Sequence, residues 1–482
     1  MRNFAIGRVI LAFLVSGTAL SLGTGLAGAT QEPWAERTPA IGAVGDLPQG
    51  RLDTESLKRL IAIGEDLFTA KFTTLDGAGR PAATQAIIPT RRRHAPQNAF
   101  FRTAGMDANG CSGCHNDPIV GGAGDFVTNV FVSEGFESAD FDSLDPQFSN
   151  ERGSTHLFGA GLIELLAREM THDLHAIRDR ALEKAWTTGV SQRVELVSKD
   201  VSFGFLSIEP DGSVGLDELE GIDTDLVVRP FSQKGVMTSL RMFTVNAMNH
   251  HHGLQPVERW GARWTGTDDH DEDGHRREFM PGDISALVAW QATLPAPARR
   301  VPDDTTWAEA AAKGEKAFDE FGCATCHRPH LPLESLAFAD PGPFDVAGTL
   351  NDRQVHKPAI YDLALLDWAK DLPRDDRGRI LVPLYGDLKR YVMTDNQVDA
   401  LGNELLAQRF VDRNIFITAE LWGVGSTPPY GHRNDFTTLD EIIRAHGGDG
   451  RPARDAYVAA SDEARSSIIA FLKTLVIEAN TP

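Results

Sequence analysis

All four cysteines of this 482-residue chain lie in two copies of one five-residue motif. The copies are CSGCH, from Cys111 to His115, and CATCH, from Cys323 to His327. Cys-x-x-Cys-His is the attachment motif of a c-type haem, in which two thiols bind the porphyrin and the histidine reaches the iron. The motifs therefore predict two covalent haems. The predicted thioether residues are Cys111, Cys114, Cys323 and Cys326, and the predicted iron ligands are His115 and His327.

The other common uses of paired cysteines fit this pattern poorly. A zinc ribbon also contains Cys-x-x-Cys pairs, but it needs no histidine directly after each second cysteine. A disulfide framework is typical of small secreted domains, and a chain of this length can bury a large core without one. Once four thioethers form, no thiol is left, so the pattern excludes chemistry that requires a free cysteine or a redox disulfide in this chain.

The first 29 residues have the pattern of a cleavable secretory signal. Arg2 and Arg8 precede an apolar run from Val9 to Leu22, and small residues follow at Ala27-Gly28-Ala29. An uncleaved membrane anchor is the alternative, although the apolar run is short for a bilayer. The pattern predicts export to the periplasm, which agrees with haem attachment outside the cytoplasm.

The chain carries a formal net charge of −21. Such an acidic balance disfavours binding to nucleic acid or to anionic membranes, and it attracts a basic electron-transfer partner. No segment after the signal is apolar enough for us to expect a membrane span.

The haem motifs belong to a longer duplicated unit. An amphipathic helix with Gly64 and Phe68 is expected before the first motif, and one with Gly314 and Phe318 before the second. After each motif, PFSQKGVMTSL (230–240) aligns without a gap with PYGHRNDFTTL (429–439), and each leads into a helix that ends in histidine and glycine. ALVAWQATL, ending at Leu294, then matches SIIAFLKTL, ending at Leu475.

This order of elements predicts a mainly α fold with two tandem cytochrome c-like haem domains. The Pro-rich stretch from Thr293 to Thr305 marks the boundary, so the expected domains are residues 30–296 and 297–482. The first domain is enlarged by insertions. One insertion contains β-branched alternation around Asp211-Gly212 and predicts a small β-hairpin.

The sixth iron ligands decide what each haem does, because an iron with two strong protein ligands moves electrons and one with an open position can bind a small molecule. For the second haem we expect His446, at the end of the TTLDEIIRAH helix, with Met393 as the competitor and a helix C-cap as the alternative role of His446. For the first haem the NHHHG cluster, His250 to His252, lies at the equivalent point. The sequence leaves open which histidine ligates, binds a propionate or lines the pocket.

Two further groups of residues are candidates for chemistry. Glu258, in QPVERWG, is a candidate acid/base for cleavage of an O–O bond, with a surface salt bridge as the alternative. Asp269, Asp271 and Asp273, followed by Gly274, resemble the opening of a calcium loop, but Met280 stands where an EF-hand has glutamate. A calcium site and a solvated acidic turn are both possible interpretations. In a variant calcium site, Glu278 or Asp283 is the candidate for the last carboxylate ligand.

On these motifs the chain resembles the di-haem oxidoreductase family, a peroxidase-like or thiol oxidoreductase-like branch of the bacterial di-haem cytochrome c peroxidase and MauG superfamily. The shared segments are GCSGCHNDPIVGG, HLFGAGLIE, DLVVRPFSQKG, LRMFTVNAMNHHHG, the DHDEDG loop, LWGVGSTPPYGHRND and TLDEIIRAHGG. The resemblance implies that His446 is the distal ligand of the electron-accepting haem. It also implies that Glu258 is the distal proton-transfer residue. From the NHHHG cluster we take His251 and His252 as further candidates for the catalytic pocket. Phe321 stands where MauG-type enzymes have a tryptophan between the haems, which argues against a radical relay at that position.

Together these observations predict a periplasmic di-haem enzyme of peroxidase type, in which electrons enter at the His327 haem and hydrogen peroxide reacts at the His115 haem. The expected electron donor is a small cytochrome c or a cupredoxin. The alternatives are a di-haem oxygenase or oxidase that acts on an organic or protein substrate, and a plain electron-transfer cytochrome.

Overall fold

The computed structural model describes residues 41–78, 108–131, 149–270 and 273–478. The predicted signal, residues 1–29, lies outside them. Helices account for 38% of residues and strands for 16%, and the strands form small sheets, so the mainly α prediction is confirmed at this level.

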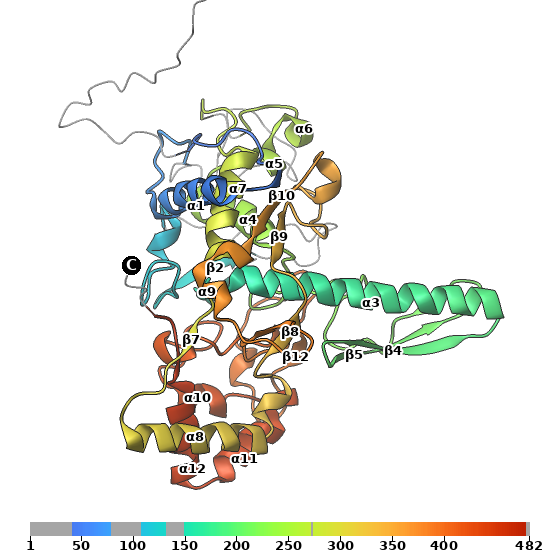
Figure 1. Ribbon diagram of the computed structural model, residues 1–482, viewed down its shortest axis with the longest axis vertical. Helices are drawn as coiled ribbons and strands as arrows, with labels where there is room; N and C mark the ends of the chain where they lie inside the picture. The colour runs from blue at the N-terminus through green and yellow to red at the C-terminus, as the bar shows by residue number, and fades with distance from the viewer. Residues whose placement is uncertain (1–40, 79–107, 132–148, 271–272, 479–482) are drawn as a thin grey trace, which may run out of the picture. The chain divides into compact units, whose positions relative to one another are not determined.

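Figure 1 shows the helices of the described residues, of which seven have nine residues or more. They are α1 (Thr54–Thr69), α3 (Ala160–Thr188), α4 (Leu240–His252), α7 (Pro281–Thr293), α8 (Thr305–Glu320), α11 (Arg451–Ala459) and α12 (Asp462–Leu472). Four shorter helices are α5 (Val257–Trp260), α6 (Ala262–Thr265), α9 (Asp367–Lys370) and α10 (Leu439–Arg444).

The strands pair in six small sheets among the described residues. In the first half they are β1 (Gly50–Arg51), β2 (Val127–Phe131), β3 (Ser149–Gly153), β4 (Gln192–Ser198), β5 (Val201–Ile208), β6 (Val214–Gly215) and β7 (Ala298–Arg299). In the second half they are β8 (Leu331–Leu333), β9 (Ala337–Asp340), β10 (Ala359–Asp362), β11 (Ile380–Val382), β12 (Arg390–Val392), β13 (Ile415–Ile417) and β14 (Leu475–Val476).

The first and last helices of each half make the same close contact. Helix α1 packs on α7, and α8 packs on α12. A methyl group at Gly64 would overlap the backbone carbonyl of Ala286, and one at Gly314 would overlap that of Ser467. Ala286 and Ser467 occupy equivalent places in the two aligned final helices. The glycines therefore allow two helix backbones to approach at the same point in both halves.

The same contact positions an aromatic ring beside each motif histidine. The ring centres of Phe68 and His115 are 6.2 Å apart with an interplanar angle of 51°. Those of Phe318 and His327 are 6.4 Å apart with an angle of 50°. The duplication seen in the sequence thus recurs as a geometric relation in the structure.

The two aligned loops also fold alike. A backbone bridge joins Phe231 to Met237 in the first loop and Tyr430 to Phe436 in the second. The side chains of Ser239 and Thr438 then accept hydrogen bonds from backbone N–H groups in the first turns of α4 and α10. These N-caps fix where the two helices begin.

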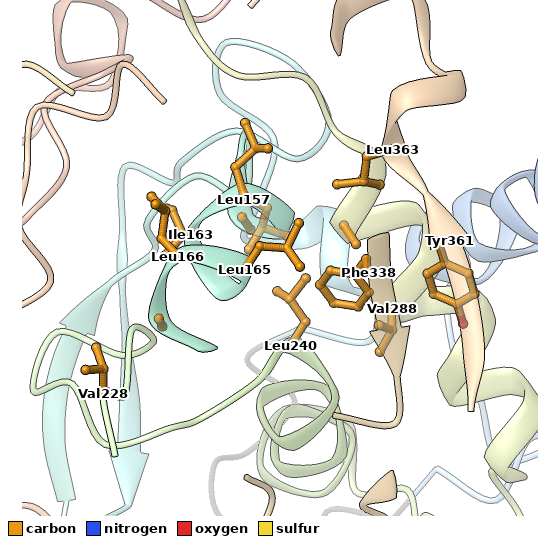
Figure 2. Packing of buried hydrophobic residues seen from close by; sticks show 14 of the residues in the cluster. Leu157, Ile163, Leu165, Leu166, Val228, Leu240, Val288, Phe338, Tyr361 and Leu363 are labelled. Atoms are coloured by element: carbon orange, nitrogen blue, oxygen red, sulfur yellow. The ribbon is translucent and has the colours of Figure 1, made fainter. Parts of the chain in front are cut away.

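Hydrophobic packing does not divide at residue 297. The large core contains residues from α1, α3, α4 and α7, and it also contains side chains between residues 331 and 388, which follow that point. Figure 2 shows Phe338 and Tyr361, from β9 and β10, beside Leu165 of α3, Leu240 of α4 and Val288 of α7. A smaller core lies between α8 and α12 and contains Phe318 and Phe471.

The predicted hairpin is present and gains a third strand. Strands β4, β5 and β6 form an antiparallel sheet that lies along α3 (Figure 1). Gly212, with φ of 89°, lies in the predicted turn between β5 and β6. The turn between β4 and β5 is formed by Lys199 and Asp200, both with positive φ, and the sequence analysis did not identify it. Within the described ranges, no helix combines the length and the apolar character that a membrane crossing requires.

The close helix contact can be tested with Gly314→Ala. Alanine raises helix propensity by about 1 kcal/mol, so the variant gains stability if the backbones do not touch. We expect instead a loss of about 1–3 kcal/mol, because the methyl group overlaps the carbonyl of Ser467. Thermal unfolding of the haem-loaded protein measures this. Gly45→Ala is the control, since a methyl group there meets nothing within 4 Å; equal stability of the two variants would contradict the account.

Candidate haem sites

The first motif presents His115 in a state suited to bind a metal. Residues Cys111–Gly113 form a single 3-10 turn. Nδ1 of His115 donates a hydrogen bond to the carbonyl of Thr155, at 2.8 Å, which leaves Nε2 as the coordinating nitrogen. Burial lowers the pKa of His115 to about 4, so the imidazole is neutral at pH 7, and the neutral form is the one that binds metals.

The second motif repeats this arrangement. Cys323–Thr325 form the 3-10 turn, and Nδ1 of His327 lies 3.1 Å from the carbonyl oxygen of Ala419 and 3.3 Å from that of Tyr385. Burial, with a smaller contribution from His446, lowers the pKa of His327 to about 4. Each motif histidine therefore has its ring fixed by a backbone carbonyl on the side away from the metal position.

The structure places the ring of His446 near that of His327, with an interplanar angle of 62°. The centres of the two rings are 6.4 Å apart. Two imidazoles on opposite sides of one metal, each with a metal–nitrogen distance of about 2 Å, have ring centres about 6 Å apart, so this pair fits one iron between them. Nδ1 of His446 donates to the carbonyl of Ile442, at 2.8 Å, which again leaves Nε2 for the metal.

The hydrogen bond to Ile442 also caps the end of α10. The helix ends at Arg444, two residues before His446, so the ligand candidate lies just beyond the helix and not in its last turn. The two roles weighed for His446, helix cap and iron ligand, are thus compatible, because they use different ring nitrogens.

Met393 lies close to His446. The backbone carbonyl of Met393 accepts a hydrogen bond from the N–H of Gly447, at 3.1 Å. A methyl group placed at Gly450 would be 3.2 Å from Cε of Met393 and 3.2 Å from Cβ of His446. The competing sulfur ligand therefore borders the same site, in which the ring centre of His446 lies 6.4 Å from that of His327.

None of the four cysteines, all within the described ranges, forms a disulfide. Burial raises the pKa of the Cys111 thiol to about 12 and the pKa values of Cys323 and Cys326 to about 11. These groups are poor thiolates at neutral pH, which disfavours thiol–disulfide chemistry. Paired thiols next to a neutral, oriented histidine fit covalent haem attachment.

The HHHG segment at the end of α4 lies beside the first motif. Nδ1 of His252 donates to the carbonyl of Ala108, at 2.9 Å, and its Nε2 lies 3.7 Å from Sγ of Cys111. His251 is near enough to contribute to the lowered pKa of His115. His250, on the same turn, is buried. The structure thus brings His252 next to the Cys111 thiol and His251 close to His115, and their catalytic role stays a prediction.

Glu258 lies in a different setting from the one expected. Its carboxylate forms a buried ion pair with the guanidinium of Arg241, whose Nε donates to Oε2 at 3.1 Å. The backbone N–H of Leu350 donates to the same oxygen at 2.8 Å. Arg241 lies in the first turn of α4 and His251 in its last turn, ten residues later, which separates their backbones by about 15 Å along the helix axis. The alternative of a surface salt bridge is wrong, since both side chains are only 1% exposed.

The ion pair belongs to a larger buried network. Nη1 of Arg241 donates to both carboxylate oxygens of Asp340, at 2.9 and 3.0 Å, and the hydroxyl groups of Ser285 and Tyr361 donate to Oδ2 of Asp340 at 2.5 and 2.7 Å. Burial alone would lower the pKa of Arg241, but the negative charges of Asp340 and Glu258 outweigh the effect of burial, and the pKa is raised. The network therefore holds α4, α5, α7 and the β9–β10 pair together around one permanent cation. The acid/base role of Glu258 stays a prediction.

The proposed calcium loop is described only in part, because Asp271 lies outside the described residues. Asp273 accepts a hydrogen bond from the N–H of His275, at 2.7 Å. Glu278 accepts one from the N–H of Gln255, and Asp283 accepts from Gly42 and Val44. Among the side chains that are described, no three His, Cys, Asp or Glu residues gather as a metal site.

Trp422, in the LWGVG segment, is a residue that the sequence analysis did not single out. Its side chain is 1% exposed, and its indole N–H has no hydrogen-bond acceptor within the described part of the chain. A buried indole N–H normally finds an acceptor, and haem propionates are acceptors, so this orphan donor fits a bound haem nearby.

Comparisons with known proteins give weak likenesses. No family model matches the chain, and no curated protein matches it. Among solved structures, hydrazine synthase from Kuenenia stuttgartiensis is similar at 13% identity, with 95% of this chain and 100% of that chain covered and a TM-score of 0.38. A MauG-like protein associated with microbial copper homeostasis is similar at 16% identity, with 57% and 79% covered and a TM-score of 0.28. Both scores are below 0.5, so neither likeness carries an argument here.

The geometry at His446 leads to a spectroscopic prediction. In His446→Ala, the haem held by His327 loses its second imidazole, and we expect its low-spin bis-histidine signal to disappear from the electron paramagnetic resonance spectrum. Met393→Leu is the matched control and should keep that signal. Loss of the signal in Met393→Leu, with no change in His446→Ala, would show that methionine is the ligand.

The Arg241 network leads to a stability prediction. Glu258→Gln leaves a buried guanidinium short of one counter-charge, and we expect it to lower the free energy of unfolding by about 3 kcal/mol or more. Glu218→Gln, in the exposed pair with Arg193, should cost much less, because solvent screens that pair. Chemical denaturation of both haem-loaded variants gives the comparison. Equal losses would mean that Glu258 does not have this structural role.

Proposed function

We propose that this protein is an exported di-haem oxidoreductase of peroxidase type. The observation that carries the proposal is the distance of 6.4 Å between the rings of His327 and His446. An iron held by two imidazoles is suited to moving electrons, so the chemistry falls to the site of His115. That site differs, because its neighbouring helix end presents His251 and His252.

The residues of each site have distinct tasks in this proposal. Cys111, Cys114 and His115 hold the haem at which the substrate reacts, and the second motif with His446 holds the haem that receives electrons. When bound, the haems supply one-electron redox chemistry that no side chain of this chain provides. Reduction of hydrogen peroxide to two waters consumes two electrons and two protons. The electrons come from an external donor and the protons from solvent.

Proton delivery is the task of the polar residues near the first motif. His251 and His252 are our first candidates, because α4 brings them to Cys111 and its neighbours. Glu258 is the competing candidate. To act, it has to exchange a proton while Arg241 and the Leu350 N–H engage its oxygens.

The expected donor is a small one-electron carrier, a cytochrome c or a cupredoxin, with a basic face. The net charge of −21 supports this choice, since opposite charge speeds the encounter of two proteins. The signal pattern of residues 1–29 supports the periplasm as the compartment.

The experiment is an anaerobic assay of peroxide reduction by the haem-loaded protein, with a reduced small cytochrome c as donor. We expect turnover in the wild type and one high-spin haem in its spectrum. The double variant Cys111→Ser/Cys114→Ser should lose turnover and keep the bis-histidine signal. The matched variant Cys323→Ser/Cys326→Ser should lose that signal and the oxidation of the donor.

Three other results would overturn the proposal. Two low-spin haems that bind no ligand would indicate a plain electron-transfer cytochrome. Dioxygen binding without peroxide turnover would favour an oxygenase or oxidase. Turnover that survives loss of Cys111 and Cys114 would show that peroxide reacts at the haem held by His327 and not at the one held by His115.

A further inference from the structure

A single histidine outside the haem motifs connects the backbone acceptors of both motif histidines. His156 lies in the HLFGAGLIE segment, just before α3, and neither its role nor its partner is fixed by the function proposed above. Its Nε2 donates a hydrogen bond to the carbonyl of Trp422, at 2.9 Å. The residue therefore joins a segment next to the first motif to a segment next to the second.

On the side of the first motif the connection is direct. Thr155, whose carbonyl accepts the Nδ1 hydrogen bond of His115 at 2.8 Å, is the residue before His156. One peptide unit thus separates the acceptor of His115 from the backbone of His156.

On the side of the second motif the connection takes one more hydrogen bond. The carbonyl of Tyr385 lies 3.3 Å from Nδ1 of His327 and also accepts the N–H of Leu421 at 3.3 Å. Leu421 is bonded directly to Trp422. A second connection runs along the backbone from Trp422 to Ala419, whose carbonyl lies 3.1 Å from the same nitrogen of His327.

The surroundings of His156 are shaped to its ring. A methyl group at Gly423 would lie 3.0 Å from Nε2 of His156. One at Gly159 would meet Cζ2 and Cη2 of the Trp422 indole at 2.5 Å. Both glycines have positive φ, of 86° and 79°, so side chains are disfavoured there on conformational grounds as well. Burial lowers the pKa of His156 to about 4, so the ring is neutral and its one N–H is the group that binds the Trp422 carbonyl.

We propose that His156 is the positioning residue that couples the two haem sites, through the hydrogen bonds from His115 to Thr155, from His156 to Trp422, and from His327 to Tyr385 or Ala419. The inference rests on the proposed function in that it requires both haems. It goes further by assigning the connection between them to a named side chain.

The transfer along this connection carries one electron and no atoms. With both haems bound, the iron held by His327 would go from ferrous to ferric as the iron held by His115 goes from ferric to ferrous. No bond would form or break, no proton would move, and the external one-electron donor would re-reduce the haem held by His327.

The test measures electron transfer between the haems without peroxide. In the haem-loaded protein, pulse radiolysis reduces the more accessible haem, and absorbance follows equilibration with the second. We expect His156→Phe, which keeps a ring but removes Nε2, to slow this step about tenfold or more, the range typical of changes behind a metal ligand. His156→Gln places an amide N–H near the position of Nε2 and should restore most of the rate.

The control is His175→Phe, because Nε2 of His175 makes the same kind of bond, to the carbonyl of Asp225 at 2.8 Å, on helix α3. It should leave the rate unchanged. His156→Asn, whose amide is one methylene closer to the backbone than that of glutamine, is the second loss variant. It should also slow the step, and it replaces His156→Phe in the test if that variant folds poorly. The spectra of both haems in each variant report whether the sites are intact.

Equal rates in wild type and His156→Asn, with both haems intact, would overturn the inference. So would a slow His156→Gln variant, because the bond to Trp422 would then not be the coupling element. Peroxide turnover is a separate measurement, so a failure of the proposed function is distinguishable from a failure of this coupling.

Discussion

The arrangement of both haem motifs depends on one constraint, the close approach of two helices at a glycine. Gly64 lets α1 lie against the backbone of α7, and Gly314 lets α8 lie against α12. Each first helix then carries a phenylalanine to about the same distance and angle from its motif histidine. Because the contact is between backbones, no side chain can be added there without moving a helix, and the motif histidine would move with it.

The same scaffold supports two different surroundings. In the second half a short helix, α10, ends just before His446, and the ring centre of this histidine lies 6.4 Å from that of His327. In the first half the equivalent helix, α4, is longer and carries a cluster of histidines to Cys111. The first turn of this longer helix carries Arg241, whose buried charge is balanced by Glu258 and Asp340. The first half is thus stabilised by a polar network at one end of α4 and presents imidazoles at the other, and this difference is the basis of the division of work that we propose.

The sequence predicted the features that are local or repeated. The two motifs, the helices with Gly64 and Gly314, the aligned loops and the hairpin around Gly212 all depend on short-range patterns, and the structure contains each as an element. The proximity of His446 to His327 could also be expected from the sequence, because the duplication indicates that the residue after the second aligned loop and helix lies near the second motif. Helix α10 ended two residues earlier than expected, because the His446 side chain itself binds the carbonyl of Ile442.

The features that the sequence did not reveal are long-range. Asp340 forms an ion pair with Arg241 although the two residues are 99 positions apart, and no sequence pattern predicts this pair. Side chains after residue 330 enter the large core, so the boundary read from a Pro-rich stretch did not indicate where packing is shared. His156 and Trp422 lie within longer segments of the sequence and were not recognised individually. The hydrogen bond between them depends on how two loops that are distant in the sequence fold together.

The central claim is that both motifs carry a covalent haem on one duplicated scaffold. Intact-mass spectrometry of the mature protein, denatured after expression in a host that attaches c-type haem, tests it most directly, because only covalent haem survives unfolding. The account predicts a mass equal to the polypeptide plus two haems, falling by one haem when the cysteines of either motif are replaced by serine. A wild-type mass with one haem, or with none, would contradict it.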